Sequence, residues 1–436
     1  MTTDRSITTE ATSIWDDRYA AGEIGTARQA DDTDPIDYTQ HDFLHRHFVT
    51  KPMTGVPSHE SYNFLLHTLF GDAARGKVLA VGSGLAMEEQ DLVASGILSN
   101  VDAYELSEVA VNTANARIAS AGMSDKLRVH AGDVTKAGLA EGSYDAVYVN
   151  AAIHHFFNIE EMMDFFHYVL KPGGLLVYNE YVGPDHHMYH DKVMAILDKV
   201  NACLDEKLRY DELRSEIRSF VPRATLEWMK EMDPSEGVHA SLILPLTYQK
   251  FDVVQRFDYG GTLMRPFWVG ILNNFDFSDG KDQTIARLIG LIEELLMDAG
   301  QIPSYHTIVA ARKGTDPAPK PLLDNEVLSY KTHGHETDKL IATIFKPQNV
   351  ISCVDFTDEN WERGVLRAGP IKLLLPGTPQ FRAALSDGKR LVLGHDKAAT
   401  IVGIEEAGEK IVLECEGPGI DRRELQAPAR YWVSGF

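Results

Sequence analysis

Cysteine is scarce in this chain of 436 residues, and its three cysteines lie far apart and form no CxxC pair: Cys203, Cys353 and Cys415. Thiols so few and so separated exclude a disulfide framework and a cysteine zinc site, and they are typical of a reducing compartment. No apolar run approaches the roughly 20 residues that a membrane-spanning helix needs. The opening MTTDRSITTEATS also lacks the apolar core of a signal peptide. We therefore expect a cytoplasmic protein without a membrane span.

Clusters of lysine and arginine are also missing. The chain has 42 basic and 64 acidic residues, which gives a formal net charge of −22 at pH 7. A protein that binds the nucleic-acid backbone gains most of its affinity from clustered basic residues, so we expect no nucleic-acid partner. Acidity of this kind favours solubility and specifies no ligand. The sequence does not decide whether the chain forms a homo-oligomer.

Strands and helices alternate over residues 1–313. Short apolar runs predict strands, and the stretches between them have helical periodicity. Alternation of this kind implies a mostly parallel sheet with helices on both faces, so the sequence predicts an α/β domain with a seven-stranded sheet. The predicted strands cover residues 77–81, 101–106, 127–131, 144–150, 175–181, 251–259 and 306–312.

Three further segments complete the predicted organisation. Residues 184–247 predict a helical insertion, in which apolar residues recur at the spacing of one long amphipathic helix: Val193, Ile196, Leu197, Val200, Leu204 and Leu208. Residues 314–337 begin with a proline-rich run that is typical of a linker. Residues 338–436 contain short β-rich runs between Gly, Pro and Asp turns, which predict a small all-β, sandwich-like domain.

A glycine turn follows the first predicted strand. In KVLAVGSGLAMEEQDL (residues 77–92), apolar residues lead into Gly82-Ser83-Gly84, and a helix-prone stretch leads out. This order is found in loops that receive a nucleotide. A dinucleotide would ask for a third glycine at Met87, whose side chain would obstruct a pyrophosphate, and no Gly-Lys-Ser/Thr follows for a P-loop. A cofactor without a pyrophosphate fits better, and a turn without any ligand is the alternative.

Polar residues end the next three strands. Glu105 ends the second strand, where a carboxylate can accept hydrogen bonds from both hydroxyls of a ribose. Asp133, in a Gly-Asp-Val run, ends the third strand, where an acid can accept from the amino group of an adenine. The fourth strand ends at Asn150, and the run LKPGGLLV leads into the fifth.

In this order and spacing, these elements resemble the class I S-adenosylmethionine-dependent methyltransferases over roughly residues 14–313. The resemblance implies a Rossmann-like fold and S-adenosylmethionine as cofactor. It implies that the glycines approach the methionyl part, that Glu105 holds the ribose and that Asp133 holds the adenine. The implied cofactor-binding residues are Trp15, Tyr19, Val81, Gly82, Ser83, Gly84, Glu105, Leu106, Asp133, Val134 and Asn150.

Two positions depart from the family's pattern. The acidic residue common two places before the first glycine is Ala80, which removes one support for the cofactor's amino group. The third glycine of the family's loop is Ala86, which is still small enough to keep the loop open.

Candidate catalytic residues follow the fourth and fifth strands, at the edge where such sheets bind ligands. His154 and His155 come directly after the fourth strand, and Glu180 lies at the end of the fifth. A histidine that titrates near neutrality can accept the proton of a hydroxyl nucleophile, so we expect a base among these three residues. The alternative is that one histidine bonds the backbone and the other packs in the turn.

Candidate acceptor-binding residues come after Glu180. Tyr181 and His186 lie at the expected mouth of the site. His186 and His190 are four residues apart and would share a helix face, where a divalent metal could bind. A polar helix start capped by Asp185 is the simpler interpretation, so the sequence predicts no metal.

Aromatic residues give a further acceptor hypothesis. Phe267 and Trp268 could stack on a sugar or on a planar ring, and ordinary core packing is the alternative. The run FTDENWERGVLRAG (residues 356–369) also resembles small β modules attached to bacterial proteins of glycan assembly. The second of these features favours a saccharide acceptor over another small molecule.

Together these observations predict an O-methyltransferase acting on a hydroxyl of a sugar, glycan or glycosylated metabolite. One alternative is a methyltransferase of a non-sugar small molecule, at oxygen, nitrogen or carbon. Another is a scaffold protein that keeps the fold without catalysis. Glu105 and Asp133 favour the enzyme, because a scaffold needs no ribose-binding carboxylate.

Overall fold

A computed structural model describes residues 3–20, 38–55, 57–314, 320–325 and 328–329, together with strands beyond residue 350. Of residues 3–11 and of those later strands it describes the backbone. The chain divides into two compact units, residues 1–41 with 69–337 and residues 42–68 with 338–436. Residues 42–68, which the sequence assigns to the first domain, therefore group with the second unit.

The first unit is built on the predicted seven-stranded sheet, whose order is β3-β2-β1-β4-β5-β9-β8. The first five strands pair in parallel, and β9 is antiparallel to both of its neighbours, so the sheet is mostly parallel. The strands are β1 (Val78–Val81), β2 (Val101–Glu105), β3 (Leu127–Ala131), β4 (Tyr144–Asn150), β5 (Leu170–Tyr181), β8 (Asp252–Gly260) and β9 (His306–Arg312).

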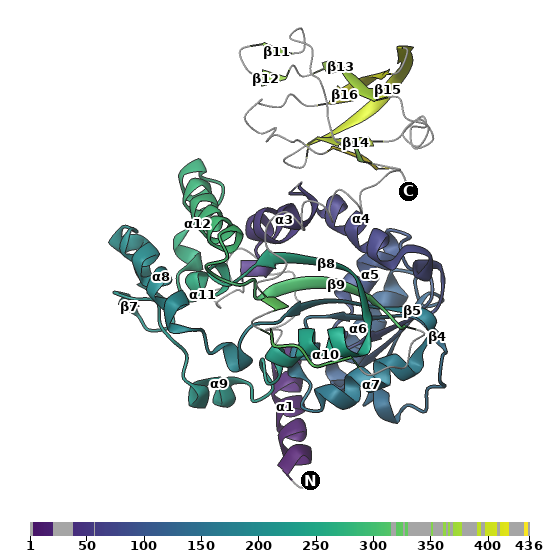
Figure 1. Cartoon of the computed structure of the whole chain (residues 1–436), viewed down its shortest axis with the longest axis vertical. Coiled ribbons are helices and arrows are strands. Elements are labelled where there is room, and N and C mark those ends of the chain that lie inside the picture. Colours follow the sequence, from purple (N-terminus) through teal and green to yellow (C-terminus); the bar gives the residue numbers. More distant parts are fainter. Residues whose placement is uncertain are drawn as a thin grey trace. The chain divides into compact units, whose positions relative to one another are not determined.

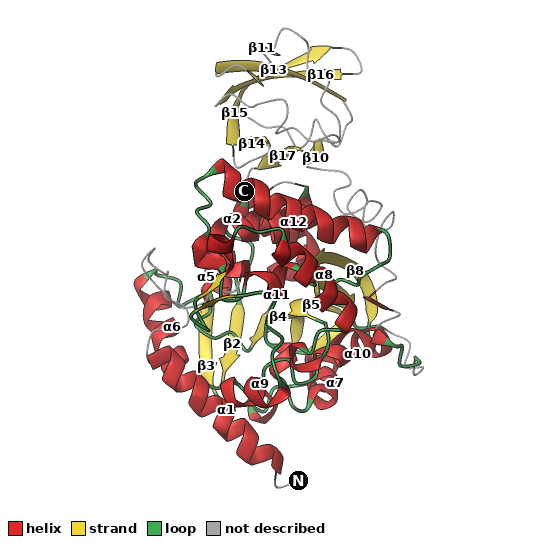
Figure 2. Cartoon of the chain, turned by 90° about the vertical axis from the view of Figure 1, so that its left-hand side faces the viewer, coloured by secondary structure: helices red, strands yellow, loops and turns green. Residues whose placement is uncertain are grey.

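Helices lie on both sides of this sheet (Figures 1 and 2). Apolar residues at helical spacing on α7 and α10 pack against residues of β1, β4, β5 and β9 in one buried cluster. Strands covered on both faces read as continuous apolar runs, and all four residues of β1 are buried. The helices are α1 (Thr3–Ala20), α5 (Met87–Ala94), α6 (Glu108–Ser120), α7 (Ile159–Val169), α10 (Ile243–Lys250), α11 (Met264–Trp268) and α12 (Gly280–Asp298).

The segment between β5 and β8 is mostly helical, but its predicted long helix is shorter than expected. Helix α8 (Asp191–Ala202) ends before Leu204, and a short 3-10 turn (Glu206–Arg209) follows. The Asp205 side chain accepts a hydrogen bond from the Lys207 N–H and starts this turn. The helical spacing of apolar residues therefore continues to Leu208 although the helix itself is interrupted after Ala202. Other elements here are β6 (Tyr210–Asp211), β7 (Glu216–Ile217) and α9 (Leu226–Met232).

The second unit combines short helices with β structure. Its helices are α2 (Asp42–His45), α3 (Lys51–Thr54) and most of α4 (His59–Phe70). A six-stranded antiparallel sheet has the order β10-β17-β14-β15-β16-β13, and β11 pairs with β12. The strands are β10 (Val350–Ile351), β11 (Trp361–Glu362), β12 (Val365–Leu366), β13 (Gly369–Pro376), β14 (Arg390–Leu393), β15 (Lys397–Ala407), β16 (Lys410–Gly417) and β17 (Tyr431–Ser434).

Parts of the predicted linker and β domain lie outside the described residues, so the sandwich-like arrangement and the domain limits stay predictions. Within the part of the chain that is described, no helix combines the length and the apolarity needed to cross a membrane.

Candidate active site

The predicted site residues gather at one edge of the sheet. Because β1, β2, β4 and β5 run parallel, their carboxyl ends meet there, where sheets of this kind bind ligands. The glycine loop follows β1, Glu105 ends β2, a 3-10 turn (Ile153–His155) follows β4, and Glu180 lies near the end of β5.

The glycine loop packs directly against the turn after β4. Gly82 has a φ of 68°, and a Cβ atom built on it would lie 2.5 Å from the Cβ of Ala152, so no other residue fits there. Val81, the preceding residue, is buried in the sheet. Ala86 also has a positive φ, of 50°, at the start of α5. Met87 is 46% exposed and accepts a hydrogen bond on its sulfur from Arg117, and its effect on a pyrophosphate stays a prediction.

Glu105 connects the glycine loop to the end of β2. One carboxylate oxygen accepts a hydrogen bond from the Gly84 N–H and the other accepts from the Ser107 N–H, both at 2.9 Å. Burial raises the pKa of Glu105, and these backbone hydrogen bonds oppose the rise. An ionised carboxylate offers about four acceptor positions, so each oxygen can still accept from a ligand hydroxyl.

Helix α1 packs against α6 and brings its aromatic residues to this edge. A Cβ atom built on Gly84 would lie 2.6 Å from the hydroxyl oxygen of Tyr19. The ring of Trp15 lies edge-on to that of His155, with centroids 5.1 Å apart. The Ser107 hydroxyl donates to the Asp16 carboxylate. The N-terminal segment therefore contacts both the glycine loop and the histidine turn.

Three residues predicted to bind the cofactor, Leu106, Asp133 and Val134, differ in accessibility. Leu106 is 46% exposed beside Glu105 and offers an apolar surface, whereas Val134 is buried. The Asp133 carboxylate already accepts from Thr135 (3.0 and 2.6 Å) and pairs with Lys136. Burial opposes a low pKa for Asp133, but these contacts hold it below its usual value. Its contact with an adenine stays a prediction.

Asn150 belongs to a chain of side-chain hydrogen bonds that crosses the edge. Its amide nitrogen donates to the Glu88 carboxylate in the first turn of α5, and its oxygen accepts from Asn179 at 3.1 Å. Asn179 in turn accepts from the Tyr259 hydroxyl at 2.7 Å. This chain fixes the Asn150 side chain between the glycine-loop helix and β5.

Glu180 and His154 form a buried pair behind the loop. His154 is 5% exposed and Glu180 is 1% exposed. The His154 Nδ1 lies 2.6 Å from one oxygen of Glu180, and the other oxygen accepts from the N–H groups of Ala152 (2.7 Å) and Ile153 (2.5 Å). Both Glu180 oxygens are thus engaged within the protein. Because Glu180 is also enclosed, these contacts orient the His154 ring and the turn after β4, and its predicted contact with an acceptor stays a prediction.

His155 is held from a different direction. Its Nδ1 lies 3.0 Å from the hydroxyl oxygen of Ser235, and that hydroxyl donates its single hydrogen to Asp233 at 2.6 Å. Because the serine hydrogen is used, Ser235 accepts from the His155 Nδ1–H, and the lone pair of the ring lies on Nε2. The other Asp233 oxygen lies 3.9 Å from the same Nδ1.

Glu236, from the helical insertion, is the central residue that the sequence analysis missed. Its carboxylate lies 3.9 Å from the His154 Nε2, 3.8 Å from the His155 Nε2 and 2.6 Å from the His187 Nε2. The Arg265 guanidinium lies 3.3 Å from it. Glu236 is separated from the histidine pair by about eighty positions and belongs to no motif, so only the fold could reveal it.

The charges of this cluster depend on one another. Burial lowers the pKa of His154, but the Glu180 charge and hydrogen bond outweigh this and raise it. Burial and the neighbouring His154 lower the pKa of His155. Burial and the Arg265 charge lower that of His187 to about 4, so this ring is neutral near pH 7. Burial acts against ionisation of Glu236, yet the hydrogen bond from His187 and the surrounding histidines hold its pKa well below the usual value.

Tyr181 and His186 do not face an acceptor as predicted. Tyr181 is fully enclosed, and its hydroxyl donates to the Pro184 carbonyl at 2.9 Å. His186 has a φ of 51° in a 3-10 turn, and its Nδ1 lies 2.9 Å from the Glu236 carbonyl oxygen. His190 precedes α8, so the two histidines do not share a helix face. The carboxylate of Asp185 accepts from the Ser241 N–H, so it does not cap α8.

Phe267 and Trp268 form core and not the predicted aromatic platform. They are 0% and 1% exposed. The Arg218 guanidinium lies over the Phe267 ring at 5.2 Å, and the Trp268 ring packs edge-on against Phe275 at 5.0 Å. Burial of both rings on inner faces of α11 explains the difference, because a buried aromatic pair and a ligand platform look alike in sequence.

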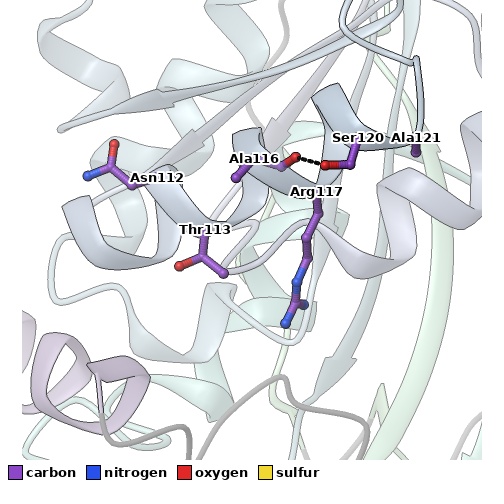
Figure 3. Close-up of a pocket in the computed structure, with 6 residues that line it drawn as sticks. All are labelled: Asn112, Thr113, Ala116, Arg117, Ser120 and Ala121. Atoms are coloured by element: carbon purple, nitrogen blue, oxygen red, sulfur yellow. Dashed lines mark hydrogen bonds between the residues drawn. The ribbon is translucent and has the colours of Figure 1, made fainter.

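A separate pocket runs along α6 (Figure 3). No residue predicted for the site lines it. The lining residues come from α6 and the position after it: Asn112, Thr113, Ala116, Arg117, Ser120 and Ala121.

Residues 79–178, which contain β1 to most of β5, match the family described as "Methyltransferase domain". A segment of 131 residues is 32% identical to sterol 24-C-methyltransferase of Gibberella zeae, and it makes up 30% of this chain. It spans 33% of that relative's length. Residues 79–178 therefore form a methyltransferase domain.

Two solved structures are similar to this chain at low sequence identity. One is the geranyl diphosphate C-methyltransferase of Streptomyces coelicolor A3(2), at 13% identity and a TM-score of 0.36, covering 70% of this chain and 97% of that one. The other is an S-adenosylmethionine-dependent methyltransferase of Mesorhizobium loti, at 14% identity and a TM-score of 0.34, covering 57% and 95%.

S-adenosylmethionine is the cofactor of this domain, and the residues around the glycine loop fit it. Glu105 has acceptor capacity left for two ribose hydroxyls, and Leu106 exposes an apolar surface beside it. The hydroxyl oxygen of Ser83 is buried without a hydrogen-bond partner among the described residues, as expected of a group that a ligand would satisfy.

Replacing the ribose-binding carboxylate should weaken cofactor binding. We expect Glu105→Ala to weaken S-adenosylhomocysteine binding by about 1.5–3 kcal/mol, the range for hydrogen bonds to charged groups. Calorimetric titration of the purified chain measures this. The matched control is Glu108→Ala, an exposed carboxylate three residues away on α6, which should bind as the wild type does. Equal affinity of the Glu105 variant and the wild type would contradict the assignment.

Proposed function

We propose that this protein transfers the methyl group of S-adenosylmethionine to a hydroxyl oxygen of a small molecule. The observation that carries the proposal is the buried His154–Glu180 pair directly behind the cofactor loop. The contact between Gly82 and Ala152 joins the two parts, because Ala152 belongs to the backbone that Glu180 holds.

Methyl transfer asks mainly for positioning. The cofactor supplies a methyl group that is already activated by a positively charged sulfur. The protein has to hold a nucleophile in line with that methyl group, and positioning of this kind can contribute about 7–11 kcal/mol. Helix α1 supports this positioning, because it places Trp15 against His155 and Tyr19 against the glycine loop.

A hydroxyl acceptor also has to lose its proton. The cluster of His154, His155 and Glu236 lies where it can assist that proton loss. Glu180 bonds the Nδ1 of His154, so the Nε2 of that ring faces Glu236 and His155. Glu180 acts through His154 and does not touch the acceptor, so it is a positioning residue. Its part corresponds to that of the carboxylate that orients the histidine of a catalytic triad.

Removing the His154 ring should separate catalysis from cofactor binding. We expect His154→Ala to lower kcat by about 10²–10⁴-fold, the usual contribution of a group that assists proton removal, with an unchanged Kd for S-adenosylhomocysteine. His167→Ala, a histidine on α7 that packs against Phe251, is the matched control and should keep normal turnover. Near-normal turnover of His154→Ala would show that the acceptor needs no help from this cluster.

Fewer observations bear on the chemical class of the acceptor than on the reaction. The predicted saccharide has lost the support of an aromatic platform, because Phe267 and Trp268 are core. The name of the Gibberella relative points to methylation at a carbon of a sterol, over a segment that is 30% of this chain. Carbon methylation of a sterol-like molecule is therefore the second candidate function. For the first candidate, methylation at oxygen, the narrower proposal is that the acceptor is a sugar or a glycosylated metabolite.

Product analysis distinguishes these acceptors. With ¹³C-methyl-labelled S-adenosylmethionine and a panel of glycosylated metabolites, phenols and sterols, we expect the label to appear on oxygen. The carbon chemical shift of the transferred methyl group identifies the atom that carries it. A carbon-bound methyl group on a sterol would favour the second candidate, and label on oxygen of a glycosylated metabolite alone would support the saccharide.

A further inference from the structure

Hydrogen bonds do not explain how Glu236 lies relative to the histidine pair, His154 and His155. The two His–Glu236 separations are 3.9 Å for His154 Nε2 and 3.8 Å for His155 Nε2. Both are too long for hydrogen bonds. One ligand atom from each of the three residues lies within 4.8 Å of the others. Ligands around a tetrahedral ion at about 2.0–2.2 Å lie roughly 3.3–3.6 Å apart, so small side-chain shifts would complete such a shell.

The second nitrogen of each histidine is already held. Glu180 bonds the Nδ1 of His154, and the Ser235–Asp233 pair accepts from the Nδ1–H of His155. Metal-binding histidines almost always have such a partner on the nitrogen that does not bind the ion, because it fixes the tautomer and the ring orientation. Both Nε2 lone pairs are therefore directed toward Glu236.

Glu236 is prepared as an anionic ligand. His187 donates from Nε2 to one oxygen at 2.6 Å, and Arg265 approaches the same oxygen at 3.3 Å. The other oxygen is the one near His155 and accepts no hydrogen bond from these two residues. The side chains of His155 and Glu236 are 16% and 22% exposed, so an ion could reach them from solvent, whereas His154 is enclosed behind them.

From this geometry we propose that His154, His155 and Glu236 bind a divalent first-row transition-metal ion, such as Zn²⁺. Two imidazoles and one carboxylate form a ligand set that such ions favour, and three protein ligands leave a fourth position open. The site differs from the His186–His190 pair considered from the sequence, because those residues neither share a helix nor join this cluster.

The ion would act on the acceptor, and this part rests on the proposed function. A hydroxyl bound in the open position has a lowered pKa and releases its proton to water. Its oxygen then forms a bond to the methyl carbon while the bond from that carbon to sulfur breaks. The electron pair stays on the sulfur, which becomes a neutral thioether. The metal and its ligands are unchanged at the end.

Metal binding can be measured without any methyl acceptor. The full-length chain is freed of metal by dialysis against a chelator, and ZnCl₂ is titrated into it in a calorimeter. We expect one equivalent to bind to the wild type. His155→Ala and Glu236→Gln should each weaken that binding by at least about 100-fold. Loss of a residue that only hydrogen-bonds a metal ligand already weakens metal binding by up to about 100-fold, and loss of the ligand itself should cost more. His190→Ala, in the same segment but outside the cluster, should bind as the wild type does.

Co²⁺ provides a second readout and guards against misfolded variants. The wild type loaded with Co²⁺ should show the visible absorption of a low-coordinate site, and the spectrum should be lost in Glu236→Gln. Circular dichroism checks that each variant is folded. If the folded wild type binds neither ion, or if Glu236→Gln binds both normally, the metal proposal is wrong.

The outcomes for the metal and for the reaction remain distinct. A wild type that binds no Zn²⁺ and still transfers methyl groups would overturn the metal site and leave the proposed function standing. A wild type that binds Zn²⁺ at these residues but methylates no acceptor in the panel would support the metal site and contradict the proposed function.

Discussion

Glu180 is an ionisable side chain almost completely removed from water, and such a group is stable only where all of its oxygens have partners. Here the partners are two backbone N–H groups of the turn after β4 and the His154 ring. The contact therefore fixes the backbone of that turn and the orientation of the histidine together. Because Ala152 of the same turn packs against Gly82, it also fixes the histidine relative to the cofactor loop.

The remaining parts of the site are arranged around this pair. The parallel strands bring Glu105 and the glycine loop to the same edge, and the helical insertion contributes Glu236, Asp233 and Ser235 from the other side. The methyltransferase domain thus contains a charged, partly enclosed cluster, part of which comes from a segment outside the matched family region. The predicted base His154 lies inside the matched region, and the added segment supplies the residues that surround it.

The sequence could predict whatever depends on local pattern. The strands ending at Glu105 and Asn150 follow from apolar runs, and parallel order then places Glu105, His154 and Glu180 at one edge. Glu236 could not be predicted, because its place depends on how the insertion folds back over the sheet. The prediction for Phe267 and Trp268 was wrong because an aromatic pair in the core has the same local sequence pattern as one that binds a ligand.

The central claim is that Glu180 holds His154 with its lone pair on Nε2, and a Glu180→Gln variant tests it most directly. The glutamine oxygen can still accept from Ala152 and Ile153, but its amide group donates to Nδ1 and forces the hydrogen onto Nε2. Methyl transfer from labelled S-adenosylmethionine should then fall by about 10²–10⁴-fold, and the upper end is the loss seen when the orienting carboxylate of a triad becomes an amide. The Kd of S-adenosylhomocysteine should stay within about twofold of the wild-type value. Full turnover in a folded Glu180→Gln variant would contradict the account.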